Sequence, residues 1–123
     1  MPIRVLIADD SELMRRQIRT TLEPDRDIEI CAEAENGLEA VRKALECRPD
    51  LVVVDVNMPV MNGLAATEDI KMFMPNLPVL LFTLYDSQQI RIESERAGAD
   101  AFLLKADAGV QLSRTIHALA RRH

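Results

Sequence analysis

Aromatic residues are scarce in this 123-residue sequence, which has no tryptophan, one tyrosine and three phenylalanines. Single-stranded nucleic acids stack their bases on aromatic side chains, so the composition disfavours that kind of binding. No apolar run reaches about 18 residues, the length that a helix needs to cross a bilayer. The amino terminus also lacks a signal-peptide pattern. We therefore expect a cytoplasmic protein with no membrane contact.

Positive charge is also in short supply, because the formal net charge is −5. A domain of this charge is not expected to bind a phosphate backbone by itself. The two cysteines, Cys31 and Cys47, have no CxxC spacing and no histidine cluster near them. We interpret them as reduced thiols of a cytosolic protein, with a disulfide as the less favoured alternative.

Short apolar runs alternate along the chain with segments of helical spacing. The runs at residues 3–8, 28–32, 51–54, 79–82 and 101–104 have the length and composition of strands. In the first intervening segment Met14, Ile18 and Leu22 recur every four residues, with Asp10 or Ser11 as its N-cap. The fourth segment, near residues 87–96, has the weakest apolar stripe and is a candidate moving part.

This alternation predicts an α/β fold, a doubly wound (βα)5 flavodoxin-like parallel sheet. Residues 28–32 alternate apolar with polar side chains, as an edge strand does, whereas the first, third and fourth runs are continuously apolar. The expected strand order is therefore 2-1-3-4-5, with the switch point between the first and third strands.

Polar side chains follow the apolar runs at the edge where ligands bind in such sheets. Asp9 and Asp10 follow the first strand, Asp55 the third, Thr83 the fourth and Lys105 the fifth. Two carboxylates about 4 Å apart repel by roughly 4 kcal/mol at an effective dielectric constant of 20. Lys105 and a divalent cation would offset this repulsion, and oxygen ligands with no histidine favour Mg²⁺ over zinc.

These groups suit a phosphoryl transfer to a carboxylate. Asp55 is the expected nucleophile, because it is the lone acid at the end of the central strand. Lys105 and Mg²⁺ would hold two phosphoryl oxygens, and the Thr83 hydroxyl would donate to a third.

The motifs in this order resemble those of the bacterial two-component response regulator receiver domain. They are Asp9-Asp10, the Asp-Val-Asn-Met-Pro run at 55–59, Met-Asn-Gly at 61–63, Thr83, Gly-Ala-Asp at 98–100 and Leu-Leu-Lys at 103–105. The residues of these motifs are most similar to those in receivers of the NarL/LuxR-type transcriptional regulators. We expect residues 1–123 to form one receiver domain with no output domain present.

The resemblance implies a function and a partner. A sensor histidine kinase would phosphorylate Asp55 in a Mg²⁺-dependent reaction, and the receiver would then control an output, with homodimerisation on phosphorylation as one route. Transcription through a LuxR-type DNA-binding domain is the expected output, so DNA would be contacted only outside this chain. A stand-alone receiver that acts by protein–protein interaction is the alternative. The domain itself would not be an enzyme beyond slow self-dephosphorylation.

The resemblance also implies roles for individual residues. Asp10, Asp55 and the backbone carbonyl of Asn57 would bind Mg²⁺, with Asp9 acting partly through water. Thr83 would move toward the phosphoryl group and Phe102 would swing inward, although plain core packing remains the other interpretation of Phe102. We further hypothesise that Asn57 and Tyr85 set the lifetime of the phosphate.

The sequence departs from the family pattern at two positions. Ala106 follows Lys105 where many receivers have proline after a cis peptide bond. A cis bond before alanine costs about 2.5–4 kcal/mol, so whether the Lys105–Ala106 peptide is cis or trans is left open. Val60 stands where such sequences commonly have glycine, which bears on the local turn.

Other classes fit less well. A phosphatase of the haloacid-dehalogenase kind has a second acid two residues after its nucleophile, and here that residue is Asn57. A degenerate receiver that serves only as a binding surface would have lost its acids, which are present here. A nucleotide-binding module would have a glycine-rich loop after the first strand, which is absent here.

Outside the expected site, three arginines occur close together in the first helical segment. We interpret Arg15, Arg16 and Arg19 as a solvated helix face.

Overall fold

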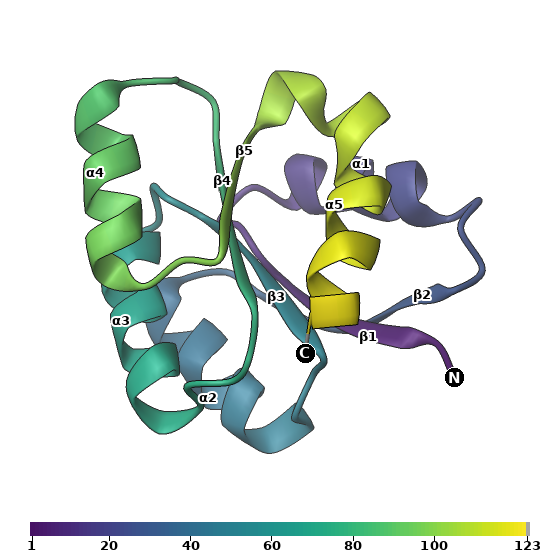
Figure 1. Cartoon of the computed structure of the whole chain (residues 1–123), viewed down its shortest axis with the longest axis horizontal. Helices are drawn as coiled ribbons and strands as arrows, with labels where there is room; N and C mark the ends of the chain where they lie inside the picture. Colours follow the sequence, from purple (N-terminus) through teal and green to yellow (C-terminus); the bar gives the residue numbers. More distant parts are fainter. Residues whose placement is uncertain (123) are drawn as a thin grey trace.

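The computed structural model describes residues 1–122, and five strands alternate in it with five helices (Figure 1). The strands are β1 (Ile3–Ala8), β2 (Ile28–Ala34), β3 (Leu51–Asp55), β4 (Val79–Thr83) and β5 (Ala101–Leu104). The helices are α1 (Glu12–Leu22), α2 (Gly37–Cys47), α3 (Gly63–Phe73), α4 (Gln88–Ala97) and α5 (Ala108–Arg122). A short 3-10 helix, η1 (Lys105–Asp107), joins β5 to α5. No helix within the described part of the chain is long and apolar enough to span a bilayer.

All strand pairs in the sheet are parallel, and the strand order is β2-β1-β3-β4-β5. The predicted doubly wound, flavodoxin-like fold and its strand order are therefore confirmed. Two strands reach further than the apolar runs suggested, since Asp55 and Thr83 are the last residues of β3 and β4. The reason is strand pairing: Asp55 of β3 pairs with β4, and Thr83 of β4 pairs with β5.

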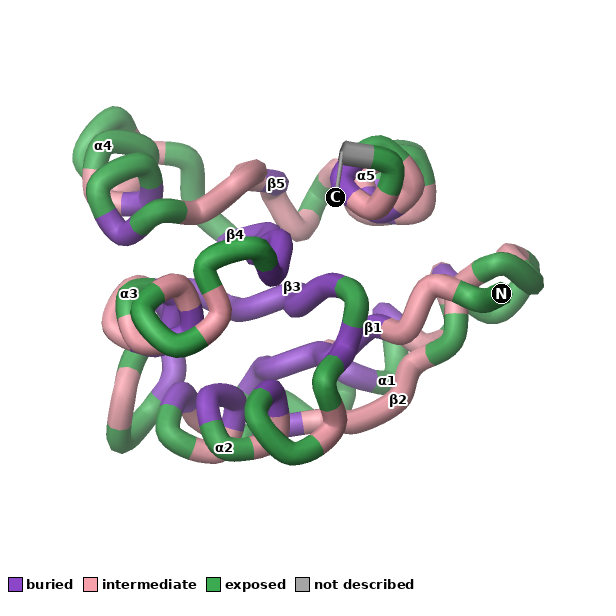
Figure 2. Tube along the Cα trace, turned by 60° about the horizontal axis from the view of Figure 1, so that its bottom comes forward, coloured by how far each residue is buried: buried purple, intermediate pink, exposed green. Residues whose placement is uncertain are grey.

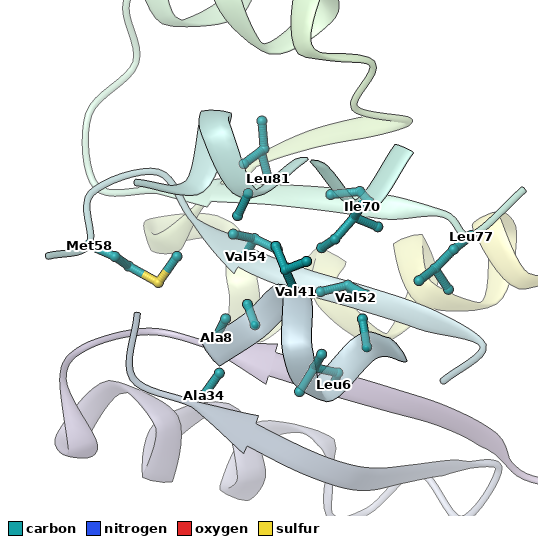
Figure 3. Packing of buried hydrophobic residues seen from close by; sticks show 14 of the residues in the cluster. Leu6, Ala8, Ala34, Val41, Val52, Val54, Met58, Ile70, Leu77 and Leu81 are labelled. Atoms are coloured by element: carbon teal, nitrogen blue, oxygen red, sulfur yellow. The ribbon is translucent and has the colours of Figure 1, made fainter. Parts of the chain in front are cut away.

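The central strands β3 and β4 are apolar except for their last residues, and helices cover both sides of the sheet. Alternate residues of β3 belong to two clusters: Leu51 and Val53 pack with α1 and α5, whereas Val52 and Val54 pack with α2 and α3. Figure 3 shows the second cluster, with Val41 of α2 beside Val52 and Val54. In Figure 2, β1, β3 and β4 are mostly buried, whereas β2 is intermediate along most of its length, as an edge strand should be.

Ser11 precedes helix α1 as its N-cap, and its side chain accepts a hydrogen bond from the Met14 N–H at 3.1 Å. Ser11, not Asp10, is therefore the N-cap, which leaves the Asp10 carboxylate available to the sheet edge. Helix α3 begins at Gly63, where a Cβ would lie 2.0 Å from the carbonyl oxygen of Asp55. Only glycine allows this helix to approach the end of β3 so closely.

Helix α4 is anchored weakly, as its apolar stripe suggested. Its buried residues are Ser94 and Ala97, and Ile92 is exposed. The Ser94 hydroxyl donates a hydrogen bond to the Ile90 carbonyl within the same helix, so this hydrogen bond does not tie α4 to the sheet. Figure 2 shows the exposed outer side of α4.

The interpretation of the arginines of α1 as a solvated face was wrong for Arg15. Its side chain is buried and donates hydrogen bonds to the Asp9 carbonyl and to Glu33 on β2, whereas Arg16 is exposed. Arg19 is half-buried and also donates to Glu33. The cause is the edge strand β2, which presents an acceptor to the side of α1 that faces it.

The remaining local expectations concern loops and thiols. The Lys105–Ala106 peptide is trans, since the described residues contain no cis peptide bond. Val60 adopts the left-handed region at φ +68°, where the family pattern would place glycine. Cys31 and Cys47 are free thiols, as interpreted from the sequence.

Candidate functional site

Three carboxylates meet at the carboxyl end of the sheet. Oxygen atoms of Asp9, Asp10 and Asp55 all lie within 4.8 Å of one another. Asp9 and Asp55 are 1% and 6% exposed, whereas Asp10 is exposed. Parallel strands β1 and β3 are neighbours, so their ends bring these acids together at the switch point.

Lys105 supplies a cation to this group. Its Nζ lies 2.8 Å from Oδ2 of Asp9 and 3.3 Å from Oδ1 of Asp55. The lysine side chain is itself buried, so its charge acts where water screens little. One ammonium group facing three carboxylates leaves an excess of negative charge in the site.

The pKa of the Asp55 carboxyl group is raised to about 6. Burial is the largest cause, because it removes the carboxylate from water, and the neighbouring charge of Asp9 acts in the same direction. Lys105 and the backbone N–H of Asn57 oppose this shift. The Asp55 carboxylate is therefore mostly ionised at neutral pH, and Lys105 offsets its burial and its repulsion by Asp9 only in part.

The carboxylate of Asp9 is already engaged. Its Oδ1 accepts a hydrogen bond from the Ser11 N–H at 2.9 Å, and its Oδ2 accepts one from Lys105. Asp10 differs, because it is exposed at the mouth of the site with its carboxylate turned toward the other two acids. Asp10 and Asp55 therefore offer the more available oxygen ligands.

The donor set suits a small, hard divalent cation. The three acids provide oxygen ligands and negative charge, and neither a histidine nor a cysteine is among the residues that line the site. Mg²⁺ prefers such oxygen ligands and keeps several waters, for which the exposed side of Asp10 leaves room. The residues present therefore fit the ion that the sequence predicted.

Of the other residues singled out from the sequence, Asn57 lines the site, whereas Thr83, Tyr85 and Phe102 are not among its lining residues. Thr83 is buried at the end of β4, and its hydroxyl accepts a long hydrogen bond, 3.5 Å, from the Tyr85 N–H. Asn57 is exposed and lines the site with the acids. Tyr85 is 75% exposed, and Leu84, rather than Tyr85, lines the site.

Phe102 lies on β5, away from the residues that line the acid site. It is half-buried against the cluster beneath α2 and α3, and the guanidinium carbon of Arg91 lies 4.9 Å from its ring centroid. Arg91 also forms two hydrogen bonds with the carboxylate of Asp86 in the loop before α4. Both interpretations of Phe102 agree with this placement, and its switch role stays a prediction.

Sequence reasoning found the acids and the lysine, and the structure brings Asp9, Asp10, Asp55 and Lys105 together. It missed Ser11 and Leu84 as lining residues. Ser11 was considered only as a helix cap, and Leu84 follows Thr83 as an apolar residue with no chemical signal. It also missed Arg15, because four-residue spacing on α1 could not show which polar group β2 presents to that helix.

Comparison with known proteins identifies the family of this chain. The response regulator receiver domain model matches residues 5–117. A protein-glutamate methylesterase/protein-glutamine glutaminase of Carboxydothermus hydrogenoformans is 43% identical over 89% of the chain and 31% of its own length. The response regulator protein VraR of Staphylococcus saprophyticus is 34% identical over 94% of the chain and 56% of its own length.

Solved structures agree with the fold. A two-component response regulator of the LuxR family from Aurantimonas has a TM-score of 0.94 at 27% identity, covering 100% of this chain and 88% of that chain. The response regulator domain of Thermotoga maritima CheB has a TM-score of 0.91 at 30% identity, with 98% of each chain covered. The signal receiver domain of NarL from Mycobacterium tuberculosis has a TM-score of 0.92 at 25% identity, covering 99% and 98% of the two chains.

Fold and site together define a flavodoxin-like α/β domain with a carboxylate site at its switch point. This chain belongs to the response regulator receiver domain family. Transcriptional regulators of the LuxR and NarL type are among its relatives, as the sequence motifs indicated. The chain spans between about a third and just over half of the length of the two curated relatives described above.

Proposed function

We propose that this receiver accepts a phosphoryl group on Asp55 from the phosphohistidine of a sensor histidine kinase, in a Mg²⁺-dependent reaction. The observation that carries the proposal is the buried Asp55 carboxylate with the Lys105 ammonium 3.3 Å away and two further acids beside it. Family membership supports it as well. On this basis the protein is a cytoplasmic signalling domain, with no enzyme activity beyond slow self-dephosphorylation.

In the reaction an Asp55 oxygen attacks the phosphorus, an O–P bond forms, and the N–P bond to the imidazole breaks. Asp10, Asp55 and the Asn57 carbonyl would hold Mg²⁺, with Asp9 acting partly through water, and the bound ion would neutralise charge on the phosphoryl oxygens. Lys105 would exchange part of its interaction with Asp9 for a phosphoryl oxygen. The Thr83 hydroxyl, now an acceptor for the Tyr85 N–H, would rotate to donate to another.

Phosphorylation would then shift a two-state equilibrium. Closure of Thr83 on the phosphoryl group would pull on the loop before α4, the helix with the weakest attachment to the sheet. Phe102 on β5 would move inward, and the face formed by α4, β5 and α5 would change for a partner or a second copy of the chain. Asn57 and Tyr85 would govern how quickly water reaches the phosphate.

For the output we favour transcription through a LuxR-type DNA-binding domain outside this chain, in keeping with the relatives of that type. One observation supports a second candidate: a methylesterase/glutaminase relative is 43% identical over 111 residues. In that case the receiver would control a catalytic domain. A stand-alone receiver that acts by protein–protein contact is the remaining alternative.

The direct test of the proposal is phosphorylation by acetyl phosphate with Mg²⁺, followed by intact mass measurement and mapping of the modified residue. We expect a mass increase of one phosphoryl group on Asp55, lost when EDTA replaces Mg²⁺. Asp55→Asn should remain unlabelled, and Glu68→Gln on the exposed surface of α3 should label as the wild type does. Labelling of Asp55→Asn at the wild-type rate would contradict the assignment.

A further inference from the structure

A buried guanidinium group lies directly behind the acid site. Arg15 is 8% exposed, although it belongs to a helix whose next residue, Arg16, is exposed. Its Nη1 donates to the backbone carbonyl of Asp9 at 2.6 Å, and its Nε donates to Oε1 of Glu33 at 2.9 Å. A buried charge of this kind is costly unless it is paired and hydrogen-bonded, so its contacts are specific ones.

The carbonyl that Arg15 holds belongs to the peptide between Asp9 and Asp10. That peptide is planar, so an interaction that fixes its oxygen also fixes the direction in which the Asp10 backbone leaves it. Asp9 has further restraints, because its N–H donates to the Ala34 carbonyl and its carboxylate is held by Ser11 and Lys105. The exposed Asp10 side chain depends more on its backbone for orientation.

We propose that Arg15, held by Glu33, is a positioning residue that orients Asp10 for Mg²⁺ binding. The inference rests on the proposed function of the same site, and it adds a residue that touches neither the ion nor the phosphoryl group. Glu33 fixes the guanidinium from β2, and the guanidinium fixes the Asp9–Asp10 peptide at the end of β1. The edge strand is thereby linked to the geometry of the site.

Charge and geometry predict opposite results when Arg15 is neutralised. A positive charge near the site repels Mg²⁺, so its removal alone would leave the affinity unchanged or raise it. Loss of the contact with the Asp9 carbonyl would instead free the peptide and lower the affinity. Groups that orient a metal ligand from outside the coordination sphere typically affect the affinity by about 10- to 100-fold.

The experiment measures the dissociation constant of MgCl₂ alone, by calorimetry and by amide NMR shifts, for the wild type, Arg15→Gln and Arg16→Gln. The two variants lose the same charge from adjacent positions of α1. We expect Arg15→Gln to weaken Mg²⁺ binding by about 10-fold, and Arg16→Gln to stay within about two-fold of the wild type. A folded Arg15→Gln protein with unchanged or tighter Mg²⁺ binding overturns the proposal, even if its melting temperature is lower.

Arg15→Lys keeps the charge and provides a second test if Arg15→Gln does not fold. A lysine ammonium lacks the planar fork that reaches Glu33 and the Asp9 carbonyl together, so we expect binding several-fold weaker than in the wild type. A folded Arg15→Lys protein with wild-type affinity overturns the proposal.

Acetyl phosphate labelling of the wild type separates the role of Arg15 from the proposed function. If labelling fails while Arg15 still controls Mg²⁺ affinity, only the proposed function is wrong.

Discussion

Asp55 is a residue whose charge opposes folding of the metal-free domain. Its pKa is raised from 3.8 to about 6, so the folded state binds this proton more tightly than the unfolded state does. The contribution of Asp55 to stability is therefore most favourable at low pH and declines as the pH rises from about 4 to about 6. At neutral pH the ionised carboxylate destabilises the fold.

Asp55→Asn should accordingly be more stable than the wild type at pH 7.5 without metal, by on the order of 2 kcal/mol. Chemical denaturation in EDTA at several pH values measures this difference, which should shrink toward pH 4. Glu68→Gln is the control, because that exposed side chain should show little change at either pH. A less stable Asp55→Asn protein at pH 7.5 would show that the interaction with Lys105 outweighs burial and repulsion.

Val60 is a second residue with a measurable energetic effect. A β-branched side chain at φ +68° is strained, and the residue is 80% exposed, so it has little packing to lose. Val60→Gly should stabilise the domain by about 1 kcal/mol, after allowance for the greater entropy of glycine in the unfolded chain.

Thermal unfolding provides the measurement for Val60→Gly. Val110→Gly is a matched control with the opposite sign, since Val110 is also exposed but lies in α5, where glycine lowers helix stability. Destabilisation by both changes would mean that Val60 is not strained.

At the scale of single residues, the sequence predicted the site residues that stand where an apolar strand ends. Asp9, Asp55 and Lys105 meet in the structure because parallel topology leaves no other place for them. Arg15 could not be predicted, because the burial of a long polar side chain depends on the partner that a neighbouring strand offers.

Among the elements, α4 is expected to be the most mobile helix. Its buried residues are the small side chains of Ser94 and Ala97, whereas α3 buries Ile70 against the sheet. Backbone amides of α4 should exchange with deuterium at least about 10-fold faster than those of α3, since local opening costs less where few apolar contacts are lost. Exchange followed by mass spectrometry tests this, and equal protection of the two helices would contradict it.

The elements themselves were largely predictable from apolar spacing and turn residues. Their boundaries were less so: β2 continues two residues past the predicted end at residue 32, because its pairing with β1 reaches Ala34. The sequence left the N-cap of α1 between Asp10 and Ser11, and the structure shows that the Ser11 side chain accepts the hydrogen bond from the Met14 N–H.

For the whole molecule, Mg²⁺ should act as a stabilising ligand. An ion that binds only the folded state stabilises it by about 1.4 kcal/mol at ten times its dissociation constant. The melting temperature should rise with MgCl₂ and should rise less in Asp10→Asn, which lacks one predicted ligand. NaCl at equal ionic strength controls for screening of the net charge of −5. An equal rise with both salts would mean that no specific site is occupied.

The pairing of Lys105 with Asp9 joins residues 96 positions apart, one from just after the first strand and one from just after the last. During synthesis on the ribosome, a chain that has emerged only as far as residue 100 already carries Asp9 and Asp55 but not the Lys105 ammonium group that pairs with them. The positive charge that lies beside Asp9 and Asp55 therefore becomes available only after translation has passed residue 105.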